Sequence, residues 1–135
     1  MSATKIQFRN IPDTDAATGW AGGHTIIADR PAGVAGGQGL GFSGGQLLGL
    51  AIGGCFCNAL QYVAHDMGVR LSKVAVDVTI SFSDNPRLAT GATVETEIAS
   101  DDPKADIAEI VKRARAGTTV GNSLPRGIAV TFTGA

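Results

Sequence analysis

Aromatic residues and charges are scarce in this chain. Of its 135 residues, 5% are aromatic and 17% are charged, whereas 44% are hydrophobic and 19 residues are glycine. The hydrophobic share excludes an intrinsically disordered chain, because enough apolar surface is present to form a core. The glycines cluster without a three-residue period, which excludes collagen. With so few large rings, the core must gain stability from close approach of backbone segments or from a partner chain.

An excess of positive charge, a secretion signal and a long hydrophobic run are also missing. The net charge of −1 argues against nucleic acid as a partner, since a basic patch would be expected. Residues 1–10 contain no apolar stretch typical of a signal peptide, and the longest nearly apolar run, residues 47–57, is too short to span a bilayer. Two cysteines without an export signal predict reduced thiols. We therefore expect one domain over residues 1–135, cytoplasmic, with neither nucleic acid nor membrane as a partner.

Hydrophobic periodicity predicts two helices and five strands. The strands are expected at residues 6–8, 23–29, 74–82, 93–98 and 127–133. The first helix, residues 46–67, is apolar nearly all round and is therefore expected to be buried. The second helix, residues 104–116, is expected to have Asp102 as its N-cap and Pro103 at its first position. The order β-β-α-β-β-α-β indicates the α+β class with mainly antiparallel pairing.

Glycines form two patterns around the first helix. Residues 39–44 match G-x-G-x-x-G, but the preceding PAGVAGGQ cannot form the strand that a dinucleotide fingerprint requires. Gly41, Gly45, Gly49 and Gly53 recur every fourth residue, which places them on one helix face. Such a face permits close contact either with the sheet of the same chain or with the same helix of a second copy.

The two cysteines lie two positions apart in the first predicted helix. At 3.6 residues per turn, Cys55 and Cys57 point about 200° apart around the axis. They can therefore neither form a disulfide with each other nor share a metal ion. A helical cysteine is most often a small buried hydrophobe, and neither His24 nor His65 has the spacing of a Cys-His pair or a zinc site. No metal or cofactor is expected.

Residues 43–56, SGGQLLGLAIGGCF, resemble the central helix of the OsmC/Ohr family, named after osmotically inducible protein C and the organic hydroperoxide resistance protein. The resemblance continues through residues 58–68, 71–78 and 111–117 and covers roughly residues 24–130. It implies an α+β fold with antiparallel sheets around a long central buried helix and a second helix. It also implies an intertwined homodimer with its active sites at the interface.

The resemblance further implies a thiol peroxidase chemistry centred on Cys55. In peroxide-reducing members a first cysteine attacks the hydroperoxide and becomes a sulfenic acid, which a second cysteine resolves as a disulfide. Cys55 matches the attacking cysteine, whereas Thr118 stands where the resolving cysteine would be, and Gly45 replaces a carboxylate. Arg30 is the candidate for the arginine that stabilises the thiolate.

Two functions follow as hypotheses. In the first, the protein reduces organic hydroperoxides through Cys55 and an external thiol reductant, with Phe42, Gln46 and Thr118 lining the substrate pocket. In the second, the protein is a non-catalytic homodimer that binds a small lipophilic ligand at the dimer interface. The absent carboxylate at Gly45 and the absent cysteine at Thr118 motivate the second hypothesis.

Overall fold

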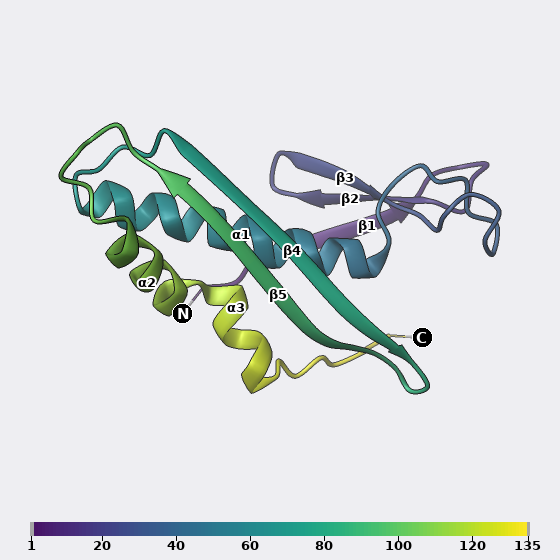
Figure 1. Cartoon of the computed structure of the whole chain (residues 1–135). Coiled ribbons are helices and arrows are strands. Elements are labelled where there is room, and N and C mark those ends of the chain that lie inside the picture. The colour runs from purple at the N-terminus through teal and green to yellow at the C-terminus, as the bar shows by residue number, and fades with distance from the viewer. Residues whose placement is uncertain (1, 135) are drawn as a thin grey trace. The chain divides into compact units, whose positions relative to one another are not determined.

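The computed structural model describes residues 2–134, which form an α+β fold with two antiparallel sheets (Figure 1). The chain divides into two compact units, one ending at Leu48 and the other beginning at Gly49. The first unit contains a three-stranded sheet of order β1-β2-β3, and the second contains a two-stranded sheet, β4-β5. The elements are β1 (Ile6–Asn10), β2 (Ala17–Ala21), β3 (His24–Ala28), α1 (Gly44–Asp66), β4 (Lys73–Asp84), β5 (Arg87–Ala99), α2 (Ile107–Gly117), α3 (Thr119–Ser123) and the 3-10 turn η1 (Leu124–Arg126).

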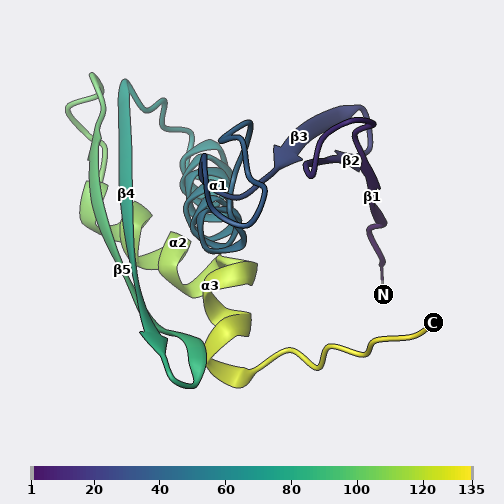
Figure 2. The same cartoon turned by 90° about the vertical axis from the view of Figure 1, so that its right-hand side faces the viewer.

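The core of the second unit lies between the two long helices and one face of the β4–β5 hairpin. Figures 1 and 2 show α1 and α2 on the same side of this hairpin. Leu60 of α1 and Ile110 and Ala114 of α2 are completely buried and belong to one hydrophobic cluster. Val76 and Val94 of the hairpin pack against that cluster. The predicted alternation of β4 therefore has its physical origin in this half-buried face.

Two glycines of α1 let the helix approach the hairpin closely. A Cβ atom at Gly53 would lie 3.1 Å from Val78 Cγ2, and one at Gly49 would lie 3.3 Å from Ile80 Cδ1. The contact of these two glycines is thus with the sheet of the same chain. The predicted four-residue stripe is wrong at Gly41, which precedes α1 and packs instead against the backbone of Ile27.

The loop between β3 and α1 is organised by a buried carboxylate. Asp29 accepts hydrogen bonds from the backbone N–H groups of Leu40 (3.0 Å), Gln38 (3.1 Å) and Arg30 (2.8 Å). The N–H of Leu40 lowers the pKa of Asp29 most; burial opposes this, and the other two amides and the Arg30 charge lower the pKa further. The glycine-rich loop has no periodic apolar face to pack, and it is held instead by hydrogen bonds from its backbone to the Asp29 side chain.

Four expectations from the sequence are corrected by the structure. β2 is absent from the predicted strands because its residues, ATGWA, show no clear alternation of apolar and polar side chains. Residues 127–133 form no strand, because no strand within residues 2–134 pairs with them. The alternation of the predicted strand at residues 74–82 would turn Phe82 inward, yet Phe82 is 56% exposed, and the register of β4 and β5 shifts between Ser81 and Phe82. The N-cap of α2 is Asp106, so this helix begins at Ile107 and not at residue 104.

The long helix α1 is less buried than its composition predicts. Its buried residues lie on one face (Ile52, Phe56, Ala59, Leu60 and Ala64), whereas Leu50 is 51% and Tyr62 is 78% exposed. By length and composition alone, α1 could cross a membrane, since its mean hydropathy reaches 1.5 over 18 residues. Core helices of soluble proteins meet the same criterion, so this property does not identify a membrane span.

The two aspartates before α2 provide a test of this cap assignment. Asp106 accepts a hydrogen bond from Glu109 N (3.1 Å), whereas Asp102 accepts one from Lys104 N (2.9 Å) outside the helix. We expect D106A to lower the free energy of unfolding by about 1 kcal/mol, the usual cost of losing an N-cap. D102A is the matched control and should cost less in urea denaturation. A larger loss for D102A than for D106A would contradict the assignment.

Candidate functional site

Cys55 and Thr118 meet although they are 63 residues apart in the sequence. Cys55 lies in the middle of α1, and Thr118 is the residue that joins α2 to α3. The Thr118 hydroxyl donates a hydrogen bond to Cys55 Sγ over 3.4 Å. Its own backbone N–H donates to Ala114 O (2.9 Å), which fixes Thr118 at the end of α2. The structure therefore brings these two predicted site residues together.

Hydrogen bonds at the Cys55 sulfur favour its thiolate form. Burial raises the pKa of the Cys55 thiol, but three donors outweigh it: the Thr118 hydroxyl and the backbone N–H groups of Val120 and Thr119. The pKa of Cys55 consequently lies below its usual value of 9.0. Because the thiolate is the nucleophilic form of cysteine, this surrounding increases reactivity at neutral pH. No positive charge is needed for this effect.

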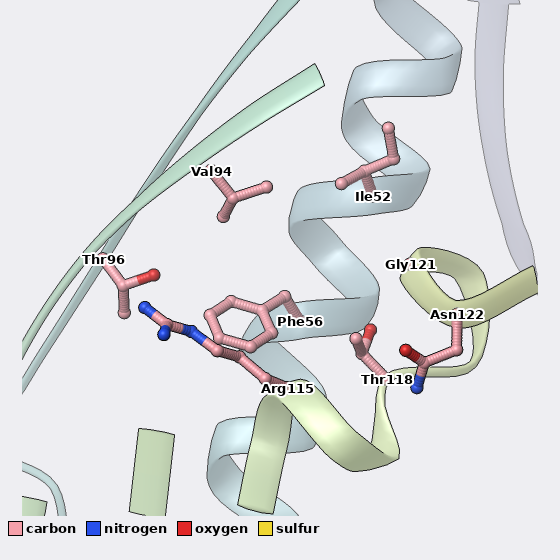
Figure 3. Close-up of a pocket in the computed structure, with 8 residues that line it drawn as sticks. All are labelled: Ile52, Phe56, Val94, Thr96, Arg115, Thr118, Gly121 and Asn122. Carbon is pink, nitrogen blue, oxygen red and sulfur yellow. The ribbon is translucent and has the colours of Figure 1, made fainter. Parts of the chain in front are cut away.

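A small pocket opens beside this pair. It has a volume of about 200 Å³ and is bounded by α1, α2, α3 and β5 (Figure 3). The side chains of Ile52, Phe56 and Val94 make much of its wall apolar. Thr118, which holds Cys55, also lines it, so the reactive sulfur lies next to the pocket wall. The remaining lining residues are Thr96, Arg115, Gly121 and Asn122.

Arg115 is a pocket residue that the sequence did not single out. In the sequence it ends the run KRAR, residues 112–115, which is typical of a solvated helix end. In the structure Arg115 is the one charged residue among those that line the pocket. Figure 3 shows its guanidinium directed toward Thr96. Only the packing of α2 beside α1 reveals this position, because nothing in the local pattern distinguishes Arg115 from Arg113.

The other predicted site residues lie in the first unit. Arg30 contacts the Asp29 carboxylate (3.2 Å) and the backbone carbonyl of Asp15. Phe42 lines a second, open hollow formed by residues 25–27 and 39–42. Gln46 and Ser43 form a reciprocal capping box at the start of α1. The backbone N–H of Ser43 donates a hydrogen bond to Gln46 Oε1 (2.9 Å), and the backbone N–H of Gln46 donates one to Ser43 Oγ (3.2 Å). The contacts of Arg30 and Gln46 are thus with the loop and the helix start.

Neither cysteine forms a disulfide in the structure. Their positions on α1 agree with the large angle expected between them, and the Thr118 contact belongs to Cys55. Within residues 2–134, no group of three or more His, Cys, Asp or Glu side chains has the proximity to hold a metal ion. The site that the structure assembles thus consists of one thiol, its hydrogen-bond donors and the adjoining pocket.

Removing the hydroxyl of Thr118 tests the electrostatics of this site. We expect T118V to raise the pKa of the Cys55 thiol, because the thiolate loses one donor. The thiolate fraction at neutral pH, and with it the rate of alkylation by iodoacetamide, should then fall. The measurement is the pH dependence of alkylation in a C57S background. T118S retains a donor and serves as the matched control; equal pKa values for T118V and T118S would contradict the assigned role.

Comparison with known proteins agrees with the fold of the chain. The family model described as OsmC-like protein matches residues 36–133. Solved structures share the fold: an OsmC-like protein from Mycoplasma pneumoniae has a TM-score of 0.74 at 20% identity and covers 92% of this chain and 88% of its own. An OsmC-like protein from Vibrio cholerae has a TM-score of 0.77 at 12% identity, covering 92% and 94%.

A further similar structure is the organic hydroperoxide resistance protein OsmC from Legionella pneumophila. Its TM-score is 0.61 at 18% identity, over 90% of this chain and 88% of its own. No curated protein sequence matches the chain. The family model covers well over half of the sequence, from the glycine-rich loop through both long helices to the C-terminal segment. The chain therefore belongs to the OsmC-like protein family.

Proposed function

We propose that the protein reduces organic hydroperoxides at Cys55 and uses an external thiol to regenerate it. The observation that carries this proposal is the set of donors at the Cys55 sulfur, the Thr118 hydroxyl and the N–H groups of Thr119 and Val120. They lower the pKa of the Cys55 thiol and so increase its thiolate fraction, and the thiolate is the form that attacks a peroxide. The similarity to the organic hydroperoxide resistance protein of Legionella pneumophila supports the choice of substrate class.

The first step transfers one oxygen atom. The Cys55 thiolate attacks the terminal oxygen of ROOH, the O–O bond breaks, and the leaving RO⁻ takes a proton to become the alcohol ROH. The sulfur is oxidised to a sulfenic acid and the hydroperoxide is reduced. The apolar side chains of Ile52, Phe56 and Val94 offer a surface for the alkyl group R.

The second step requires a thiol from outside the chain. By the family resemblance Thr118 matches the resolving cysteine; it contacts Cys55 Sγ, but its hydroxyl cannot form a disulfide. Cys57 points to another side of α1 and forms no disulfide with Cys55. An incoming thiol RSH would convert Cys55–SOH into Cys55–S–S–R and water, and a second thiol would release Cys55–SH. This requirement agrees with the cytoplasmic location expected from the sequence, since thiols are kept reduced there.

The proposal includes a homodimer. Apolar side chains remain exposed on α1 at Leu50 and Tyr62, and on the C-terminal segment at Ile128, Val130 and Phe132. The last three alternate along an extended stretch that pairs with no strand of residues 2–134. A second copy of the chain would remove both surfaces from water, which is the usual reason for apolar surface of this kind. The sequence resemblance to a family of intertwined dimers supports the same partner.

The two cysteines give the direct test of the chemistry. In a coupled assay with cumene hydroperoxide and dithiothreitol, C55S should lose consumption of the hydroperoxide down to the level without protein. C57S should keep the wild-type rate, because Cys57 lacks the donors that surround Cys55. If C55S consumed the hydroperoxide as fast as the wild type, the proposed function would be wrong.

A charge on the exposed face of α1 tests the homodimer. The wild type should have about twice the chain mass of 13.7 kDa in light scattering after gel filtration. L50E should shift the mass toward one chain, because Leu50 is half exposed on α1 and a carboxylate is costly to bury. K112E on α2 is the control and should remain dimeric. A wild type that runs as one chain at micromolar concentration would contradict the dimer.

The apolar pocket also supports the alternative of a non-catalytic protein that binds a small lipophilic ligand. Its volume of about 200 Å³ lies below the range usual for drug-sized ligands, so the ligand would have to be small. Native mass spectrometry separates the two functions. Stoichiometric recovery of an apolar molecule from a protein without hydroperoxide consumption would favour the alternative, whereas consumption that depends on Cys55 favours the enzyme.

A further inference from the structure

The pocket beside Cys55 combines three features, of which the proposed hydroperoxide chemistry uses only the apolar wall. It contains one positive charge, its wall is otherwise apolar or uncharged, and it is small. Arg115 supplies the charge at the C-terminal turn of α2. Thr118 follows three residues later, and its hydroxyl donates a hydrogen bond to the Cys55 sulfur. The pocket therefore has a side that adjoins the Cys55 sulfur through Thr118 and a cationic side.

The charge of Arg115 is available to a ligand. None of the ion pairs formed within residues 2–134 involves Arg115. By contrast, Arg113 on the same helix pairs with Glu109 over 2.9 Å. No carboxylate is among the residues that line the pocket. An arginine beside an apolar cavity without a counter-ion is electrostatically complementary to a carboxylate or another small anion.

The size of the pocket restricts the anion to a small molecule. A volume of about 200 Å³ is well below the roughly 300–1,000 Å³ of sites that enclose drug-sized ligands. A long acyl chain therefore cannot be enclosed there. A short apolar stem between the Thr118 side and the Arg115 side fits the lining by Ile52, Phe56 and Val94. Figure 3 shows the Arg115 guanidinium directed toward Thr96.

We infer that this pocket selects a small carboxylate-bearing thiol as the external reductant of Cys55, with Arg115 as the residue that determines this specificity. The inference rests on the proposed function in one respect: an external thiol is needed because Thr118 replaces a second cysteine. The carboxylate contacts Arg115 while the thiol sulfur reaches the oxidised Cys55. One S–S bond forms, and the sulfenic hydroxyl leaves as water with the proton of the thiol.

The decisive experiment does not require hydroperoxide. Reduced protein in a C57S background is mixed with symmetric disulfides of one skeleton, either the anionic dithiodipropionate or its neutral amide. The Cys55 thiolate attacks the disulfide, Cys55–S–S–R forms, and R–S⁻ leaves; mass spectrometry follows the rate. For each protein, the rate with the anionic disulfide is divided by the rate with the neutral disulfide. This ratio is then divided by the same ratio for R115Q, which cancels the intrinsic reactivity of the two reagents.

We expect this divided ratio to be about fivefold for the wild type, the upper part of the range for an exposed ion pair, and to decrease with added salt. R113Q is the matched control, since Arg113 lies two residues away and outside the pocket lining. R113Q should retain the wild-type ratio, and R115K should retain part of it. A wild-type ratio equal to that of R115Q, or a loss in R113Q as large as in R115Q, would overturn the inference.

A second arm separates this inference from the proposed function. Cys55 is oxidised with cumene hydroperoxide, and its reduction by mercaptopropionate and mercaptopropionamide is timed in the wild type and in R115Q. Faster reduction by the anionic thiol in the wild type alone supports the inference. If the hydroperoxide is consumed but Arg115 has no effect, the specificity inference fails and the function remains. If the disulfide ratio depends on Arg115 but no hydroperoxide is consumed, the proposed function fails and the pocket assignment remains.

Discussion

The packing of α2 against α1 is the constraint on which the candidate site depends. Ile110 and Ala114 are fully buried in the same cluster as Leu60, so α2 cannot shift along α1 without opening the core of the second unit. This packing places the end of α2 at the middle of α1, and Thr118 follows that end directly. The contact between the Thr118 hydroxyl and Cys55 Sγ is thus a product of apolar packing. A reactive thiol obtained in this way is held by rigid helices, as precise positioning requires.

The hydroxyl of Thr118 has two consequences for Cys55, one for the pKa of its thiol and one for its regeneration after oxidation. The hydroxyl donates to the sulfur and, with two backbone amides, lowers the pKa of Cys55 despite its partial burial. A hydroxyl cannot form a disulfide, so in the proposed function a thiol from outside the chain must regenerate Cys55. Arg115 lies in the wall of the same pocket, and we infer that it contacts this thiol. Under this proposal, Thr118 both stabilises the thiolate and makes the protein dependent on an outside reductant.

The periodicity of hydrophobic residues was sufficient to predict a helix or strand where segments close in the sequence bury its apolar face. The helix over residues 46–67 and the strands at residues 74–82 and 93–98 were predicted because local patterns determine them, and the structure confirms them as α1, β4 and β5. The strand at residues 127–133 was wrong, since its alternation is real but a strand also needs a neighbour. Cys55 and Thr118 were identified as a pair through the family resemblance. Arg115 could not be identified, because its position in the pocket depends on tertiary packing alone.

In the proposed function, the residue at position 118 determines whether oxidised Cys55 is resolved within the chain or by an outside thiol. This claim is tested most directly by intact mass and peptide mapping of T118C after one equivalent of cumene hydroperoxide, alongside the wild type and without added thiol. Because Thr118 Oγ1 lies 3.4 Å from Cys55 Sγ, a cysteine there is within reach of a disulfide. The account predicts that T118C loses two hydrogen atoms and links residues 55 and 118, while the wild type gains one oxygen atom at Cys55. An oxidised T118C without this link, or a wild type whose Cys55 stays unmodified, would contradict it.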